Sequence, residues 1–101
     1  MKALLIDPDT QSIAAIELTS QEAIAEIIGY DTIESDEIGP DGDRLYFDEE
    51  CFLRGTSGRF QIDKVIPVSG KGLIVGSPDE GQTLQDARST EADIQARIKY
   101  L

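Results

Sequence analysis

Apolar and polar residues near the start of the chain predict a β-hairpin. A short apolar run at residues 3–6 is stopped by the sequence Asp-Pro-Asp-Thr at residues 7–10, and a second apolar segment follows at residues 13–18. Asp-Pro pairs favour turns, and short apolar runs bounded by turn residues are typical of strands. We therefore expect two strands joined by a turn.

The pattern then changes to a helical period. Apolar side chains recur on one face of residues 20–28, which predicts a short amphipathic helix. Thr19 precedes Glu22 by three residues, the spacing of a capping box at a helix N-terminus. Gly29 follows the last apolar residue and is suited to a left-handed C-cap.

The middle of the chain predicts a second hairpin. Residues 30–34 alternate weakly, residues 39–43 are rich in Gly, Pro and Asp, and residues 44–48 carry three large apolar side chains in a row. This order is typical of two strands joined by a turn, and here the turn is acidic. Residues 59–63 and 65–68 are further strand-like pieces.

The last third of the chain predicts a buried strand and a helix. Residues 70–76 place an unbroken apolar triplet between glycines, as buried strands often do. Residues 82–88 fit either an edge strand or an irregular arm. Thr90 and Asp93 repeat the capping spacing, and apolar residues recur on one face of a helix predicted over residues 91–100.

These elements predict an α+β fold with a mostly antiparallel, strongly bent sheet of about five to seven strands. The two helices are expected to cover its apolar face or one end, and a closed or half-closed barrel is the architectural alternative. The length of 101 residues predicts a single domain over residues 1–101.

Composition narrows the chemistry. Cys51 is the only cysteine and histidine is absent, which excludes an internal disulfide, a Cys or His zinc site and a His-based catalytic triad. No residue is assigned as catalytic, metal-binding or cofactor-binding, and no cofactor is expected. The apolar run at residues 3–6 is too short for a signal peptide or a membrane span, so we expect a cytoplasmic protein that binds no membrane.

Charge is distributed unevenly along this chain, whose formal net charge is −11. Residues 31–50 carry nine carboxylates against one cation, Arg44, a local charge of −8. The nine are Asp31, Glu34, Asp36, Glu37, Asp41, Asp43, Asp48, Glu49 and Glu50. Residues 51–78 carry one carboxylate, Asp63, against four cations, which are Arg54, Arg59, Lys64 and Lys71. The acidic set is a candidate interaction face, and the basic set is a candidate counter-patch.

Two local motifs have plainer explanations than ligand binding. The glycines at positions 70, 72 and 76 do not lie between a strand and a helix, as a phosphate loop requires, so turns or close backbone contacts explain them better. The carboxylates of residues 39–43 lack the closing ligands of a calcium loop. Weak cation binding by Asp41, Asp43 and Asp36 is the alternative there.

Part of the chain resembles a family of small bacterial and phage-borne domains of unknown function. In that family a Met-Lys-Ala-like first strand precedes a short helix, and a Phe-x-Ile strand later leads into a Pro-Val/Ile-x-Gly-x-Gly-hydrophobic-Val-Gly segment and an Asp/Gly turn. The segments that carry the match are residues 1–6, 60–62, 67–76 and 79–81, and the resemblance as a whole extends over roughly half of the chain. The resemblance implies a small α+β accessory domain of phage or mobile-element type and implies no mechanism.

Two classes of function agree with these features. The first is a non-enzymatic interaction module whose acidic face binds a basic protein surface, or the basic counter-patch of a second copy in a homodimer. A DNA-mimic inhibitor is a narrower form of this hypothesis, while direct binding to nucleic acid is disfavoured by repulsion from phosphates. The second class is a small hydrolase, cation-dependent or not, that uses Asp and Glu alone.

Overall fold

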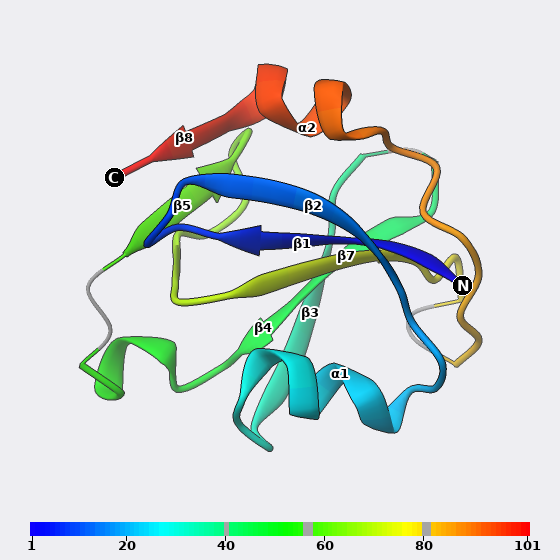
Figure 1. Ribbon diagram of the computed structural model, residues 1–101, viewed down its shortest axis with the longest axis horizontal. Coiled ribbons are helices and arrows are strands. Elements are labelled where there is room, and N and C mark those ends of the chain that lie inside the picture. Colours follow the sequence, from blue (N-terminus) through cyan, green and yellow to red (C-terminus); the bar gives the residue numbers. More distant parts are fainter. Residues whose placement is uncertain (40, 56–57, 80–81) are drawn as a thin grey trace.

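The computed structural model describes residues 1–39, 41–55, 58–79 and 82–101. Within these ranges the chain forms eight strands, two α-helices and one short 3-10 helix (Figure 1). In chain order they are β1 (Lys2–Asp7), β2 (Ser12–Glu17), α1 (Glu22–Ile28), β3 (Ile33–Glu37), β4 (Asp43–Asp48), η1 (Cys51–Leu53), β5 (Arg59–Ile62), β6 (Val68–Ser69), β7 (Gly72–Gly76), α2 (Glu91–Arg97) and β8 (Ile98–Tyr100).

The strands form two antiparallel sheets, which confirms the predicted α+β class. The larger sheet has the order β2-β1-β7-β4-β3, and the smaller sheet has the order β6-β5-β8. The architecture is therefore two sheets instead of one bent sheet, and the five-stranded sheet does not close into a barrel. β7 lies at its centre with all five residues buried, as predicted for the apolar segment between glycines.

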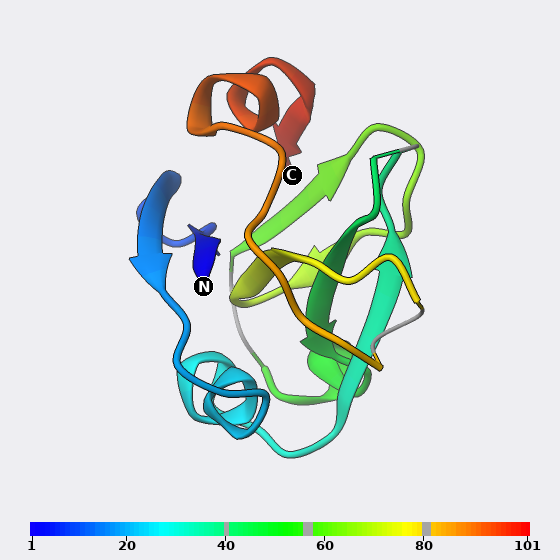
Figure 2. The same ribbon diagram turned by 90° about the vertical axis from the view of Figure 1, so that its right-hand side faces the viewer.

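Apolar side chains cover both faces of the five-stranded sheet. On one face, Leu73 and Val75 of β7 pack with Ile24 and Ile28 of α1. On the other face, the side chains of β1 and β7 pack against β5 and α2, around the fully buried Phe60. Figure 2 shows the two helices on opposite sides of the strands. The sheet is thus the middle layer of the protein.

The two helix N-termini differ in how well the capping signal predicted them. In α2, Thr90 and Asp93 form the expected capping box, with the Asp93 amide donating to Thr90 Oγ1 at 3.1 Å. In α1 the Thr19 cap is wrong, because the Ala23 amide donates instead to Ser20, at 3.3 Å from its Oγ. Gly29 ends α1 in the left-handed conformation (φ 95°), as expected.

The C-terminal helix is shorter than predicted. It ends at Arg97, and the next three residues form β8, in which Ile98 pairs with Ile62 and Tyr100 pairs with Phe60. Without β8 this side of β5 would expose unpaired backbone groups beside the core, so strand pairing outweighs the helical period of the sequence.

Other elements are displaced from their predicted bounds. β3 begins at Ile33 instead of residue 30, although the β3–β4 hairpin itself is confirmed. Pro40 of its turn lies outside the described residues. Of residues 65–68, only Val68 is in a strand, and residues 82–88, as far as they are described, form an irregular arm with one bridge from Gln85 to Gly76.

The close packing of β7 requires a glycine at position 72. A Cβ atom on Gly72 would lie 2.6 Å from Cζ of Phe60 and 3.0 Å from Cδ1 of Leu45. Both neighbours are fully buried. Gly72→Ala is therefore expected to lower the free energy of unfolding by about 1–2 kcal/mol through overpacking, measured by urea denaturation.

A double-mutant cycle tests whether the Phe60 ring is the group that excludes a side chain at position 72. In a Phe60→Leu background the atom nearest to the new methyl group is gone, so Gly72→Ala should cost less than in the parent protein. An equal cost in both backgrounds would show that the Phe60 ring is not what requires glycine here.

Candidate functional site

The structure divides the nine carboxylates of residues 31–50 into two groups. Asp43 and Asp48 are buried, with 1% and 3% of their surface exposed. Both side chains therefore lie largely below the surface that a partner would meet. The seven others are exposed or half-buried, and they are Asp31, Glu34, Asp36, Glu37, Asp41, Glu49 and Glu50. They lie on β3 and in the segments that flank β3 and β4.

Asp43, the first residue of β4, binds the arm that leads into α2. Its Oδ1 accepts a hydrogen bond from the amide of Arg88 at 2.9 Å, and its Oδ2 accepts one from the amide of Ser89 at 2.8 Å. Both carboxylate oxygens are therefore used within the protein. No group of three or more Asp, Glu or Cys side chains that could hold a metal ion is found in the described ranges, so the weak cation site suggested for Asp36, Asp41 and Asp43 does not assemble there.

Asp48, the last residue of β4, is the centre of a second hydrogen-bonded cluster. It accepts hydrogen bonds from the Thr32 hydroxyl, from the Glu50 amide at 3.1 Å and from Nε of Arg54 at 2.9 Å. The Arg54 guanidinium also lies 4.3 Å above the centre of the Tyr30 ring. Burial raises the pKa of Asp48, but the hydrogen bonds together outweigh burial and hold this pKa below its ordinary value.

Most of the surface carboxylates in the acidic segment have no cationic partner. Glu50 pairs with Arg54 at 3.3 Å. No ion pair within the described residues involves the other six, which are Asp31, Glu34, Asp36, Glu37, Asp41 and Glu49. Arg44, the one cation of this segment, donates instead to Ser35, from Nε to Oγ and from Nη2 to the carbonyl, each at 3.0 Å. The β3 side of the molecule therefore keeps its negative charge.

The pairing of β3 with β4 determines which amides and carbonyls of β3 point away from the sheet. The amide of Ile38 donates to the Asp43 carbonyl, and the amide of Glu49 donates to the Thr32 carbonyl. Because hydrogen-bonded and non-hydrogen-bonded pairs alternate along antiparallel strands, every second residue between them turns its amide and carbonyl away from β4. Those residues are Ile33, Ser35 and Glu37.

This outer backbone edge of β3 is partly occupied by groups of the protein itself. The Ser35 carbonyl accepts the bond from Arg44 Nη2, and the Ile33 amide donates to the Asp31 carbonyl at 3.0 Å. These two hydrogen bonds leave fewer outward backbone groups of β3 for pairing with a partner strand.

The structure does not gather the four cations of the counter-patch into one surface. Arg59 begins β5 beside Ser69 of β6, and Lys71 follows two residues after that partner. Lys64, in contrast, lies beyond the opposite end of β5. Arg54 is already paired with Asp48. Arg59 and Lys71 are thus the cations left to form a basic surface at this end of the molecule.

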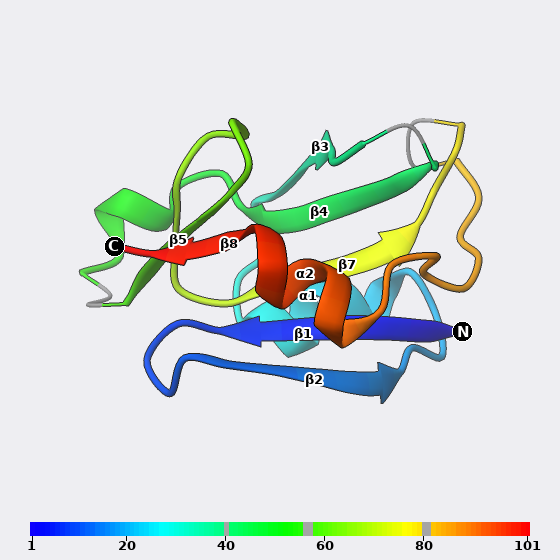
Figure 3. The same ribbon diagram turned by 90° about the horizontal axis from the view of Figure 1, so that it is seen from above.

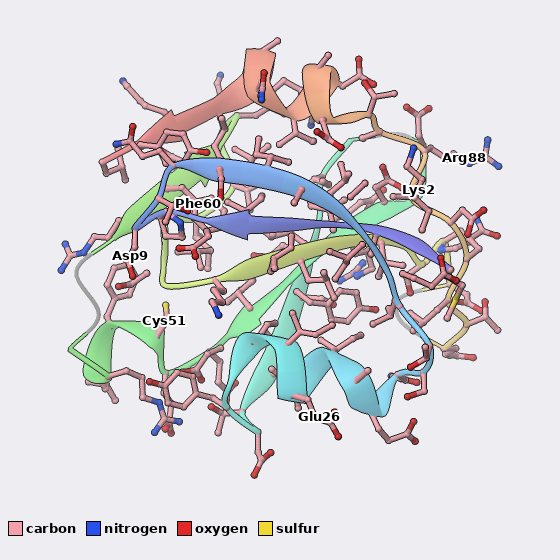
Figure 4. The ribbon with its side chains drawn as sticks, viewed as in Figure 1. Lys2, Asp9, Glu26, Cys51, Phe60 and Arg88 are labelled. Carbon is pink, nitrogen blue, oxygen red and sulfur yellow. The ribbon has the colours of Figure 1, made fainter. Side chains whose placement is uncertain are left out.

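A cavity of about 190 Å³ adjoins this end. Its lining residues are Asp9, Ile28, Tyr30, Asp48, Cys51, Arg54, Ser69, Gly70 and Lys71. The Cys51 sulfur accepts a hydrogen bond from the Ser69 amide at 3.5 Å, and Figure 4 shows it directed from η1 toward the turn that carries Asp9. The carboxylate of Asp48 at this cavity has a lowered pKa, whereas a general acid requires a raised one.

The other displaced aspartate pKa values also move downward. A hydrogen bond from the Thr83 hydroxyl lowers the pKa of Asp79, and one from the Thr90 amide lowers the pKa of Asp93. These carboxylates are stabilised in their charged form, which suits hydrogen bonding and charge better than proton donation.

No helix among the described residues combines the length and the apolar character needed to cross a bilayer. No family model, curated protein or solved structure matches the chain. The resemblance to small phage-borne domains therefore stays a prediction.

Proposed function

We propose that the protein is a non-enzymatic interaction module that binds a basic surface of another protein through the carboxylates of β3 and its flanking segments. The observation that carries this proposal is the set of six surface carboxylates without a cationic partner in the described residues. Arg44, the one cation of this segment, is bound to Ser35 and forms no ion pair with them in the described residues.

An unneutralised acidic surface attracts a basic partner over several ångströms and repels phosphate-rich molecules. Charge of this kind raises the rate of association with Lys- and Arg-rich surfaces, and it disfavours nucleic acid and anionic lipid. Because the outer backbone of β3 is partly occupied, contact through side chains is favoured over addition of a strand. A DNA-binding protein is one partner of this kind, as in the DNA-mimic form of the hypothesis.

Neutralising the β3 carboxylates tests the proposal. The variant Glu34→Gln/Asp36→Asn/Glu37→Gln should weaken binding of a fluorescein-labelled oligolysine peptide at least about tenfold, since three lost contacts of about 0.5 kcal/mol each amount to that factor. Fluorescence anisotropy at low ionic strength measures this affinity.

A matched control distinguishes the loss of the β3 carboxylates from the loss of overall negative charge. The variant Glu22→Gln/Glu26→Gln/Glu91→Gln changes the net charge equally and alters only exposed helical residues. It should weaken binding of the same peptide less than about threefold, because the β3 carboxylates stay intact and distant exposed charges are screened. Equal losses in the two variants would show that the peptide responds to overall charge, and the β3 side would lose its assigned role.

A second copy of the chain is an alternative basic partner. Arg59 and Lys71 are exposed and lie near each other, so they could receive the β3 carboxylates of another molecule. Such a dimer rests on exposed ion pairs and would dissociate as salt is raised, because exposed pairs are screened.

A further inference from the structure

The two edges of the five-stranded sheet differ in charge. Figure 3 shows β2 and β3 along opposite rims of the sheet. β3 carries Glu34, Asp36 and Glu37 among its five residues. β2 has the sequence Ser-Ile-Ala-Ala-Ile-Glu, with its one charged residue at the end. In a chain with a net charge of −11, the β2 edge is the one suited to approach by an identical molecule.

Hydrogen bonds at the start of β1 determine which backbone groups of β2 face outward. The Leu18 amide donates to the Met1 carbonyl at 2.7 Å. The next residue, Lys2, turns away from β2, with its carbonyl accepting from the Ala87 amide and its amide donating to Oδ1 of Asp86. Its partner in β2 therefore also turns away, as does every second residue along β2. Those outward residues are Ile13, Ala15 and Glu17.

The outward backbone groups of β2 are open as far as the structure describes the chain. No hydrogen bond joins the outward amides and carbonyls of β2 to any part of the chain that the structure describes. This contrasts with β3, where Arg44 and the Asp31 carbonyl bind two of the outward groups. Open strand edges of this kind pair readily with another strand.

We propose that β2 pairs antiparallel with β2 of a second copy, around a two-fold axis at Ala15, so that the two five-stranded sheets become continuous. In this register Ala15 lies opposite Ala15 of the other copy, and Ile13 lies opposite its Glu17. All three outward residues of each strand then form hydrogen bonds, roughly six in total. A register centred on Ala14 would place Glu17 opposite Gln11, whose positive φ of 51° removes it from an extended strand.

Side chains along β2 agree with this pairing. Ala14 and Ala15 are exposed and small, so they do not obstruct the approach of a second strand. The two Glu17 carboxylates of a pair are separated by about four residues of strand, or about 13 Å, which is longer than the screening length of about 8 Å at physiological salt. This inference goes beyond the proposed function, because the dimer uses the opposite edge and leaves both β3 surfaces accessible.

Cysteine cross-linking tests the register. Cα atoms of a directly opposed hydrogen-bonded pair are about 5.5 Å apart, within the range of a disulfide, whereas residues displaced by two positions exceed about 7 Å. Ala15→Cys should therefore form a disulfide-linked dimer under mild oxidation at least tenfold faster than Ala14→Cys. Ala96→Cys, on the exposed face of α2, measures random collision, and the buried Cys51 is present in all three.

Salt and a proline variant test the interface independently of cross-linking. Both copies are strongly negative, so raising salt should strengthen a β2 dimer, whereas it would dissociate a dimer held by ion pairs. Ala15→Pro removes an outward amide that β1 does not use, and should yield a monomer with a nearly unchanged melting temperature. Size-exclusion chromatography with light scattering measures both effects.

The outcomes that overturn this proposal are distinct from failure of the β3 site. A protein that stays monomeric at high concentration in high salt, or equal cross-linking of the three cysteine variants, would exclude the β2 dimer. Faster cross-linking of Ala14→Cys would exclude the register centred on Ala15. None of these results affects peptide binding by the β3 carboxylates.

Discussion

Replacing Asp43 with alanine is expected to lower the free energy of unfolding by about 4 kcal/mol. Its carboxylate is 1% exposed and accepts the amides of Arg88 and Ser89. Hydrogen bonds to a charged group contribute about 1.5–3 kcal/mol each, and alanine would leave two amides without an acceptor in a partly buried place. Urea denaturation monitored by circular dichroism measures the loss.

Asp41→Ala is the matched control for this prediction. It removes an exposed carboxylate two residues earlier and should change stability by less than about 0.5 kcal/mol. Asp43→Asn keeps one acceptor and should lie between the two. Hydrogen exchange of the Arg88 and Ser89 amides should also accelerate in Asp43→Ala. If the Asp43 and Asp41 variants were equally stable, the carboxylate would not be what holds this arm.

The two buried aspartates explain how the acidic hairpin is held in place. Asp43 is the first residue of β4 and Asp48 is the last. One binds the arm before α2, and the other binds Thr32, just before β3, together with Arg54. Each end of β4 is thereby joined to a different part of the chain. The surface carboxylates of β3 therefore lie on a strand whose pairing partner, β4, is held at both ends.

Local patterns predicted the elements whose residues interact with near neighbours. The capping box of α2 joins Thr90 to Asp93, and the C-cap of α1 needs only Gly29, so sequence spacing was sufficient. The apolar triplet of β7 correctly predicted its burial. The end of α2 was not predictable in this way, because Ile98 continues the helical stripe that begins at Ile94 and leaves it only to pair with Ile62 of β5.

In the candidate site too, contacts between residues far apart in the sequence could not be predicted. A count of carboxylates along the sequence does not reveal which of them point inward. Asp43 is bound by amides 45 and 46 positions later, and no local motif marks that contact. Asp48 follows Tyr46 and Phe47, both buried, and this apolar context was the one available signal that it lies at the core. The placement of the cations was equally hidden, since the sequence does not show that β5 separates Arg59 from Lys64.

The second large expected effect is at Asp48. Asp48→Ala should lower the free energy of unfolding at pH 7 by about 3 kcal/mol, the low end of the cost of breaking a buried ion pair, because the Arg54 side chain is 30% exposed and partly screened. The Thr32 hydroxyl and the Glu50 amide also lose their acceptor. Glu49→Ala, at an exposed neighbour without an ion pair in the described residues, is the control and should change stability little.

The stability lost in Asp48→Ala is expected to depend on pH, and the lowered pKa of Asp48 determines the direction. The pKa of Asp48 is lower in the folded protein than its ordinary value of 3.8, so its charged form stabilises the fold. That stability is complete above about pH 5 and is lost as pH falls through the lowered folded pKa. The difference in unfolding free energy between the parent and Asp48→Ala should therefore narrow between about pH 5 and pH 2, while the difference for Glu49→Ala stays small throughout. Because each comparison is made against the parent at the same pH, titration of the other carboxylates cancels. A gap for Asp48→Ala that stays constant down to pH 2 would mean that packing and neutral hydrogen bonds, and not the ionised carboxylate, stabilise this end of β4.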